Sequence, residues 1–184
     1  MANFKKMKIV KIILVSFGLL LLIFFVLFFG SIWYYSYQDR KFYNIEMPEG
    51  SDFQKPIEYL TMSQIDSLEN IVVDTNKILI VGTGYTGYDF YMWFKPTEKG
   101  ELYIKAYEIT QGQRLSESKL TNRTKTIVWR LSDNYKLFRG NSVIDEGTFE
   151  KYYPTRFELW FKSEINGTER KLTEKSYLID GWDR

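Results

Sequence analysis

The chain has 184 residues, of which 45% are hydrophobic and 18% aromatic, and it contains neither cysteine nor histidine. These absences exclude disulfides, a lipid-modified cysteine anchor, zinc ligation by Cys or His, and catalysis by an imidazole base. The positive formal charge of +2 arises in residues 1–39, which contain four Lys and one Asp. The remainder holds 21 of the 25 basic and 22 of the 23 acidic residues and is therefore nearly neutral. A nearly neutral domain predicts no nucleic-acid partner.

The first predicted element is a transmembrane helix over residues 12–35. An uncharged run extends from Ile12 to Gln38, and its apolar part covers Ile12–Phe29. A helix needs roughly 20 predominantly apolar residues to cross a bilayer, so the run is long enough. Residues typical of the membrane interface flank it: Lys5, Lys6, Lys8 and Lys11 before the span, and Trp33, Tyr34, Tyr35 and Tyr37 at its end.

The lysine excess predicts that residues 1–11 form a cytoplasmic tail and that the chain after the helix lies on the other side of the membrane. The alternative is a cleaved signal peptide, which also begins with basic residues. However, the apolar run exceeds the usual 7–15 residues, and Phe29-Gly30-Ser31-Ile32-Trp33 offers no small-residue cleavage site. We therefore expect an uncleaved signal anchor with the lipid bilayer as its partner.

Residues 36–56 contain Pro48, Gly50 and Pro56 and are predicted to form a linker to one domain over residues 57–184. A short helix is expected over residues 61–70, with Ser63 as its cap. From Ile71 the pattern changes to strands. They are predicted over 71–73, 78–81, 88–95, 101–110, 126–131, 135–138, 142–149, 157–162 and 170–179, with one helical turn at 116–121.

Two turns are predicted from their residues: Arg139-Gly140-Asn141, and Asn166-Gly167 as a type I′ hairpin. Many short strands separated by turns favour a mainly β fold, an antiparallel β-sandwich after the N-terminal transmembrane helix. Immunoglobulin-like topology is the specific prediction, although the Cys…Trp…Cys signature is absent; a barrel is the alternative.

Two stretches resemble a known group of proteins. One is Phe90-Tyr91-Met92-Trp93-Phe94 together with Lys99 to Glu108. The other is Tyr153 to Phe161, followed by Glu169-Arg170-Lys171-Leu172 and Gly181-Trp182. They resemble small, uncharacterised, single-pass bacterial membrane proteins with a β-rich outer domain. The resemblance covers about half of the chain and implies a place in the bacterial envelope, at the inner (plasma) membrane; it implies no site residue.

The chain offers three candidate sites. Gly82-x-Gly84-x-x-Gly87 has the dinucleotide-binding spacing, but an alternating strand pattern follows it instead of a helix, so a turn is favoured. The carboxylates that could pair as acid and base are Glu101 with Glu108 and Asp145 with Glu146, but no catalytic constellation is recognisable. The third candidate is a set of aromatics expected on non-core strand faces, where they could contact a partner: Tyr91, Trp93, Tyr103, Tyr107 and Trp160.

The sequence therefore predicts a membrane-tethered, non-catalytic domain that binds a protein partner or an envelope component, with no metal and no cofactor. A carbohydrate- or peptide-binding module is the alternative, since aromatic rows stack on sugars and open sheet edges receive strands. A hydrolase that uses only carboxylates is a remote alternative. The predicted location is the bacterial inner membrane, with the domain in the periplasm or outside the cell.

Overall fold

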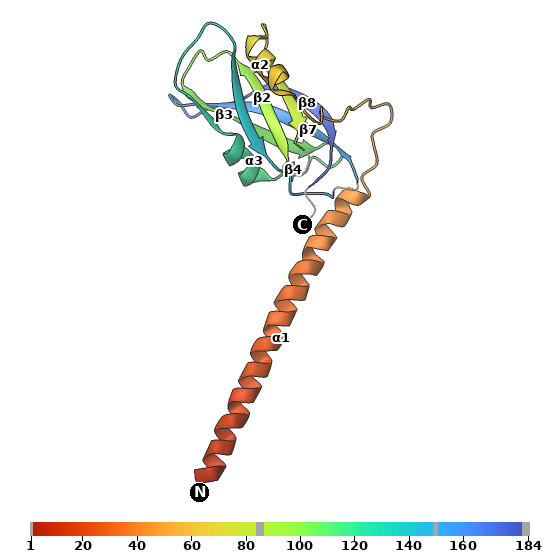
Figure 1. Ribbon diagram of the computed structural model, residues 1–184, viewed down its shortest axis with the longest axis vertical. Helices are drawn as coiled ribbons and strands as arrows, with labels where there is room; N and C mark the ends of the chain where they lie inside the picture. The colour runs from red at the N-terminus through yellow and green to blue at the C-terminus, as the bar shows by residue number, and fades with distance from the viewer. Residues whose placement is uncertain (1, 84–86, 149–150, 182–184) are drawn as a thin grey trace. The chain divides into compact units, whose positions relative to one another are not determined.

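The computed structural model describes residues 2–83, 87–148 and 151–181 and divides into two compact units, residues 1–40 and 41–184 (Figure 1). The long helix α1 extends over Ala2–Tyr43. Its apolar side chains from Ile12 to Ile32 are exposed, and the helix is long and apolar enough to cross a membrane. The prediction of a long apolar N-terminal helix is therefore confirmed.

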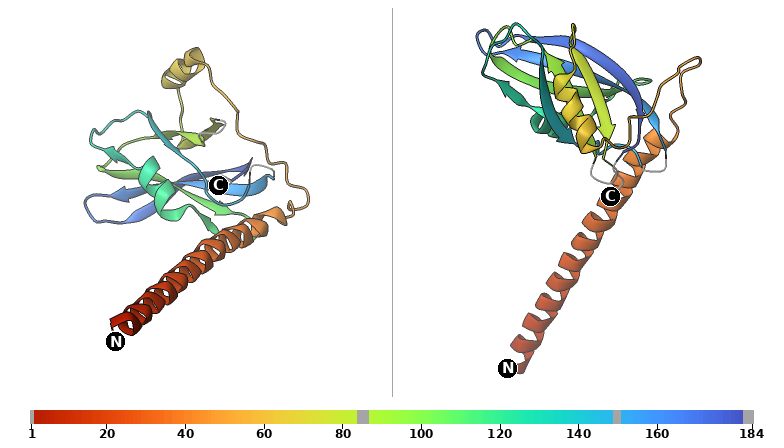
Figure 2. Two further views of the ribbon diagram at one scale, coloured as in Figure 1. Left: turned by 60° about the horizontal axis from the view of Figure 1, so that its bottom comes forward. Right: turned by 45° about the horizontal axis from the view of Figure 1, so that its top comes forward.

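The second unit is mostly β, with two short helices that lie apart from each other (Figures 1 and 2). The helices are α2 (Met62–Asn70) and α3 (Glu117–Thr124). The strands are β1 (Lys77–Gly82), β2 (Tyr88–Phe94), β3 (Gly100–Glu108), β4 (Arg114–Leu115), β5 (Thr126–Val128), β6 (Lys136–Ser142), β7 (Tyr153–Ser163) and β8 (Glu169–Ile179).

The strands form two antiparallel sheets. One has the order β1-β2-β6, and the other has the order β4-β3-β7-β8. Strand β5 also pairs with β3, at residues 100–102, whereas β4 pairs with residues 106–107 of the same strand. The mainly β, antiparallel class predicted from the sequence is therefore confirmed.

Alternating side chains of both sheets form one shared core. Along β2, Phe90, Met92 and Phe94 belong to this core, as the two-residue period predicts. The Phe90 ring lies 5.7 Å from that of Phe157 on β7, and the Phe94 ring stacks on that of Phe161 at 5.0 Å. These ring contacts join the two sheets.

Helix α3 connects β4 to β5 beside β3. Its last residue, Thr124, is fully buried; its hydroxyl accepts a hydrogen bond from the backbone N of Ile104 at 3.0 Å and donates one to the carbonyl of Leu120. A Cβ on Gly140 would lie only 2.9 Å from the Thr124 Cα. Gly140 thus permits close packing in the middle of β6, and the predicted turn at residues 139–141 is wrong.

Helix α2 confirms the helix predicted from residue 61, with a different cap. Thr61, not Ser63, is the N-cap: its hydroxyl accepts from the backbone N of Gln64, and the Gln64 side chain accepts from the backbone N of Thr61. The predicted strand at residues 71–73 is absent, and Val72 is 97% exposed. The predicted strand at 142–149 is also not formed in its described part, where β6 ends at Ser142.

The hairpin between β7 and β8 is present, but its turn is longer than predicted. The connection covers residues 164–168; Gly167 has a φ of +67°, whereas Asn166 does not have a positive φ. The Asn166 side chain instead accepts hydrogen bonds from the backbone N and hydroxyl of Thr168. The type I′ prediction is therefore wrong, because that turn requires two residues with positive φ.

The first residues of the second unit are buried in its core. Phe42 is 4% exposed with its ring 4.9 Å from that of Tyr153, and Ile45 is 8% exposed. Both residues belong to the core cluster and fall in the segment that the sequence analysis assigned to the linker. The first residue of β7 therefore lies at the end of the domain where the chain enters.

Candidate functional site

Two of the five candidate aromatics lie on a covered face. Tyr91 and Trp93 point away from the main core, as predicted, but they are 4% and 3% exposed. They form a second cluster with Leu68 of α2 and with Val81, against which Leu60, Val73, Leu79 and Leu137 pack. The expectation that this pair is exposed is corrected: α2 and its flanking segments bury it, so it cannot contact a partner in this conformation.

The other three candidates lie on the outer face of the larger sheet. Tyr103 and Trp160 are directly paired across β3 and β7, and Tyr107 is paired with Arg156. Tyr103 is buried, at 3% exposed, whereas Tyr107 and Trp160 are half-buried. Burial raises the pKa of Tyr103, and the adjacent Glu169 carboxylate raises it further. Tyr107 and Trp160 are therefore the two candidates available at the surface.

Charged groups hold these rings in place. The side chain of Glu158 is 5% exposed; its carboxylate accepts from Arg156 Nε at 3.0 Å and from Trp160 Nε1 at 2.9 Å. Lys171 Nζ lies 3.5 Å from the same carboxylate and 2.8 Å from that of Glu174. Hydrogen bonds in which the donor or the acceptor is ionised are shorter and stronger than neutral ones, so the bond to Glu158 fixes the Trp160 ring.

Two cations also lie against the rings. Lys105 Nζ is 3.8 Å from the centroid of Trp160 and 3.0 Å from the Glu169 carboxylate. The Arg156 guanidinium lies 5.5 Å from the centroid of Tyr107. The Lys105 ammonium lowers the pKa of Glu169, and the Lys171 ammonium lowers the pKa of Glu174.

These rings and charges form one surface on the larger sheet. We call the following residues the outer β face: Lys105, Tyr107, Arg156, Glu158, Trp160, Lys171 and Glu174.

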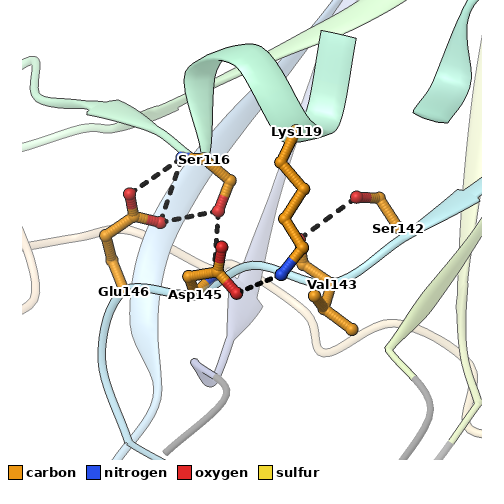
Figure 3. Close-up of polar contacts among 6 residues, drawn as sticks. All are labelled: Ser116, Lys119, Ser142, Val143, Asp145 and Glu146. Carbon is orange, nitrogen blue, oxygen red and sulfur yellow. Dashed lines mark hydrogen bonds and ion pairs between the residues drawn. The ribbon is translucent and has the colours of Figure 1, made fainter. Parts of the chain in front are cut away.

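A second polar cluster joins α3 to the segment after β6 (Figure 3). Ser116, the N-cap of α3, has φ 41° and ψ 43° and is 7% exposed. Its backbone N donates to both Glu146 carboxylate oxygens, at 2.8 and 3.0 Å, and its hydroxyl donates to one of them at 2.8 Å. That hydroxyl accepts from the backbone N of Asp145, whose carboxylate contacts Lys119 Nζ at 2.5 Å.

The spacing Ser116-x-x-Lys119 resembles that of a serine nucleophile and its lysine base in some hydrolases. Here the Lys119 ammonium pairs with Asp145, and the Ser116 hydroxyl donates to Glu146, so the lysine is not placed to take the serine proton. The carboxylate of Glu146 stabilises a left-handed residue at the start of a helix. The cluster therefore serves to hold α3 in place.

We expect Ser116→Ala to lower the free energy of unfolding by about 1–3 kcal/mol, because it removes two partly buried hydrogen bonds and keeps the unfavourable φ. Ser116→Gly removes the same bonds but relieves a left-handed penalty of about 1–2 kcal/mol, so it should cost less. Chemical denaturation of both variants measures the difference. Equal losses in the two variants would show that the backbone strain at Ser116 is no larger than the entropic cost of glycine in the unfolded chain, about 0.5–1 kcal/mol.

The predicted carboxylate pairs do not form acid–base sites. Glu101 and Glu108 lie near opposite ends of β3, about 24 Å apart at ~3.4 Å per residue. Glu108 is 1% exposed and accepts from the backbone N of Thr110 and of Gln111, so it stabilises a turn. The carboxylates of Asp145 and Glu146 have different partners, because that of Asp145 pairs with Lys119 and that of Glu146 accepts from Ser116. No group of three His, Cys, Asp or Glu suited to a metal occurs among the described residues.

The glycine motif lies in a β-hairpin. Gly82 ends β1, and Gly87 precedes β2 with a φ of +109°; Gly84 is outside the described residues. The backbone N and hydroxyl of Thr83 both donate to the Gly87 carbonyl. Because a strand follows the motif and no helix begins there, it lacks the helix N-terminus that binds a pyrophosphate.

Two further buried tyrosines link distant segments. The Tyr88 hydroxyl donates to an Asp180 carboxylate oxygen at 2.6 Å, and the Tyr153 hydroxyl donates to the Glu146 carbonyl at 2.8 Å. Burial is the main cause that raises the pKa of each phenol above its ordinary value of 10.0. The folded protein therefore keeps these protons at a pH where the unfolded chain has lost them.

We expect the free energy of unfolding to be constant with respect to these tyrosines below about pH 10 and to fall above it. Absorbance at 295 nm and circular dichroism, followed together from pH 8 to 13, should show exposed tyrosines ionising first and the buried ones only with unfolding. Tyr88→Phe should make stability less steeply dependent on pH above 10. Ionisation of all tyrosines near pH 10 with unchanged circular dichroism would contradict this assignment.

Sequence reasoning missed one surface feature. The strand predicted over residues 126–131 would place Ile127, Trp129 and Leu131 on one side. However, β5 ends at Val128, and the three side chains are 46%, 65% and 57% exposed. The alternation of apolar residues was visible, but it does not distinguish a core face from an exposed one.

No protein-family model, curated protein or solved structure matches the chain.

Proposed function

We propose that this protein is a membrane-tethered, non-catalytic domain that binds a protein partner or an envelope component through its outer β face. The observation that carries the proposal is the fixed arrangement of Tyr107 and Trp160 among paired charges. Half-exposed aromatic and arginine side chains held rigidly are typical of residues that dominate binding energy in interfaces. The outer face of the other sheet is covered by α2.

The anchor in this proposal is α1. Its lysine-rich start would lie in the cytoplasm and the β domain on the far side of a bacterial inner membrane, because positive charge is retained on the cytoplasmic side. Tethering keeps the domain close to the membrane and raises its effective concentration for partners there. The chain is then an uncleaved signal anchor, the form that the length of its apolar segment favours.

We further propose that the β domain is an immunoglobulin-like sandwich. If β1, β2, β3, β6, β7 and β8 take the letters A, B, C, E, F and G, the sheets become A-B-E and C-F-G. Strand β4 then lies beside C, where variable-type domains have C′. In this scheme the Phe90–Phe157 contact joins strands B and F, the strands that a disulfide joins in antibody domains.

Tyr153 supports the same topology. Immunoglobulin-like domains often have a tyrosine near the start of strand F, whose hydroxyl bonds to the backbone a few residues upstream. Tyr153 is the first residue of β7, and its hydroxyl donates to the carbonyl seven residues earlier. The C-F-G sheet is then the one that presents the outer β face.

The contacts within the outer β face favour a protein partner over a carbohydrate. A sugar stacks on the open face of an aromatic ring, but Lys105 lies over the Trp160 ring at 3.8 Å. Interfaces between proteins, in contrast, are enriched in aromatic residues and arginine. A carbohydrate-binding module is therefore the second candidate, and it would require Lys105 to move.

Site-specific photocrosslinking in the native membrane tests this function. A photoreactive phenylalanine replaces Tyr107 or Trp160 in the full-length protein, and Val72, which is 97% exposed, is the matched control position. We expect positions 107 and 160 to give the same discrete crosslinked product and position 72 to give none. Equal capture at position 72, or no product at 107 and 160, would overturn the proposal.

A further inference from the structure

Arg156 lies in a row of side chains that crosses the outer β face. It is directly paired with Tyr107 on β3 and with Ser176 on β8. Directly paired residues of neighbouring antiparallel strands have their side chains about 5 Å apart on the same side of the sheet. The adjacent residues Phe157 and Tyr177 belong to the core, which places Arg156 and Ser176 on the outer side. We call Tyr107, Arg156 and Ser176 the Arg156 row.

The Arg156 row contains hydrogen-bond donors that have no acceptor. The Arg156 Nε donates to Glu158, but the two terminal amino groups of the guanidinium make no hydrogen bond to another described residue. The hydroxyls of Tyr107 and Ser176 make none within the same part of the chain. An ionised carboxylate only accepts hydrogen bonds, and its two oxygens match the planar fork of an arginine. The free donors of the row therefore fit a carboxylate.

A second arginine lies on the other side of Tyr107. Arg114 on β4 is directly paired with Tyr107, and its terminal amino groups donate to Glu117 and Thr121. Its Nε is buried and has no hydrogen-bond partner among the described residues. The side chain of Glu117 is 69% exposed, so water screens its pairing with Arg114. Two guanidinium groups thus flank Tyr107, and their charge favours an anionic ligand over a neutral one.

The carboxylates beside the row have other partners. One oxygen of Glu158 accepts from Arg156 Nε, and the other accepts from Trp160 Nε1. The Glu174 carboxylate is held by Lys171 at 2.8 Å. Because Glu158 is hydrogen-bonded to Arg156 only through Nε, the edge formed by the two terminal amino groups remains for a second carboxylate. The guanidinium is also held in place in advance, which lowers the cost of binding.

We propose that the Arg156 row binds a carboxylate of the partner protein, which belongs either to an Asp or Glu side chain or to the C-terminus. The two terminal amino groups of Arg156 would donate to its two oxygens, and the hydroxyls of Tyr107 and Ser176 would donate to the remaining lone pairs. This inference rests on the proposed partner-binding function and names the chemical group that the outer β face recognises.

Fluorine NMR of the full-length protein in neutral-lipid nanodiscs tests the row, with 3-fluorotyrosine at position 107 alone. Acetyl-aspartate amide is the probe for a side-chain carboxylate, and acetyl-glycine is the probe for a C-terminal one. Acetyl-asparagine amide is the neutral control of matched shape. All titrations are made at constant ionic strength, and near-ultraviolet circular dichroism verifies that each variant is folded.

We expect at least one carboxylate probe to shift the fluorine resonance saturably and the asparagine probe to leave it unchanged. Arg156→Gln should weaken carboxylate binding roughly tenfold. Arg156→Lys keeps the charge but loses the two parallel donors, so it should weaken binding by a smaller factor, roughly threefold. Arg123→Gln, at an exposed arginine of α3, is the matched control and should bind as the wild type does.

Equal shifts with the aspartate and asparagine probes, or no saturable shift with either carboxylate probe, would overturn the inference. So would a folded Arg156→Gln variant that binds as tightly as the wild type. A shift induced by phosphatidylglycerol in the nanodisc, and not reversed by the carboxylate probes, would assign the row to lipid headgroups instead and overturn it as well.

The two proposals fail separately. Crosslinks to a partner from positions 107 and 160 without carboxylate binding would refute the carboxylate site and leave the outer β face as the binding surface. Carboxylate binding at the Arg156 row without a crosslinked partner would refute the proposed function and leave a carboxylate site that recognises no protein in that membrane.

Discussion

Phe157→Ala is expected to lower the free energy of unfolding of the β domain by about 3–5 kcal/mol. Phe157 is fully buried in the centre of β7, with its ring 5.7 Å from that of Phe90 and 6.3 Å from that of Tyr177. The substitution removes apolar contacts to both sheets and leaves a cavity between them. Because typical domains have only about 5–15 kcal/mol in total, this loss brings the domain close to unfolding.

Guanidinium denaturation of the full-length protein in detergent micelles, followed by near-ultraviolet circular dichroism, measures this effect. Trp129→Ala is the matched control, since it also removes an aromatic ring but from a side chain that is 65% exposed. The control should change stability by less than about 0.5 kcal/mol. Similar losses in both variants would contradict the position of Phe157 at the centre of the core.

The absence of cysteine makes this packing important. A domain with no disulfide depends on burial of apolar surface for its stability, and the aromatic contacts between β2 and β7 lie within its core. The second contact between these strands is the stacked pair Phe94 and Phe161. Replacing one of these aromatic residues by a small one therefore affects the packing of both sheets.

Local patterns were sufficient for most of the strands. Along β2 the alternation of Phe90, Met92 and Phe94 with Tyr91 and Trp93 predicted correctly which residues share a side. Side-chain direction alternates along any strand, so this information is carried by neighbouring residues alone. The same pattern does not reveal whether a second layer covers the other side.

That missing information explains the error at Tyr91 and Trp93. They are buried because Leu68, more than twenty residues earlier in the chain, lies against them from α2. Gly140 was misread for a similar reason: glycine is common in turns, but here it provides space for Thr124 of α3. Both assignments depend on packing between segments that are distant in sequence.

The polar clusters could not be predicted from neighbouring residues in the sequence either. The hydrogen bonds between Ser116 and Glu146 join residues 30 positions apart, and the position of Lys171 beside Trp160 depends on a register shift between Leu159 and Trp160. A one-residue change of register moves every side chain to the other side of the sheet. The sequence therefore indicated that Trp160 lies on an outer face but not which charges surround it.

The second large effect is expected in α1. Leu21→Arg combined with Phe25→Arg should abolish membrane integration, because each change costs roughly 3–4 kcal/mol at the centre of a spanning helix and the pair about 7 kcal/mol. That sum is comparable with the whole insertion free energy of about 18 apolar residues. Carbonate extraction measures the result: the wild-type chain should stay in the membrane pellet, and the double variant should not.

Tyr35→Arg with Tyr37→Arg is the matched control, because it adds the same charge at the end of the helix, where long basic side chains reach the polar interface at little cost. It should remain in the pellet. A double variant at positions 21 and 25 that stays integrated would refute the spanning role of α1. An intact chain of 22.0 kDa in the wild-type pellet would favour an uncleaved anchor, whereas a shorter chain would indicate a cleaved signal peptide.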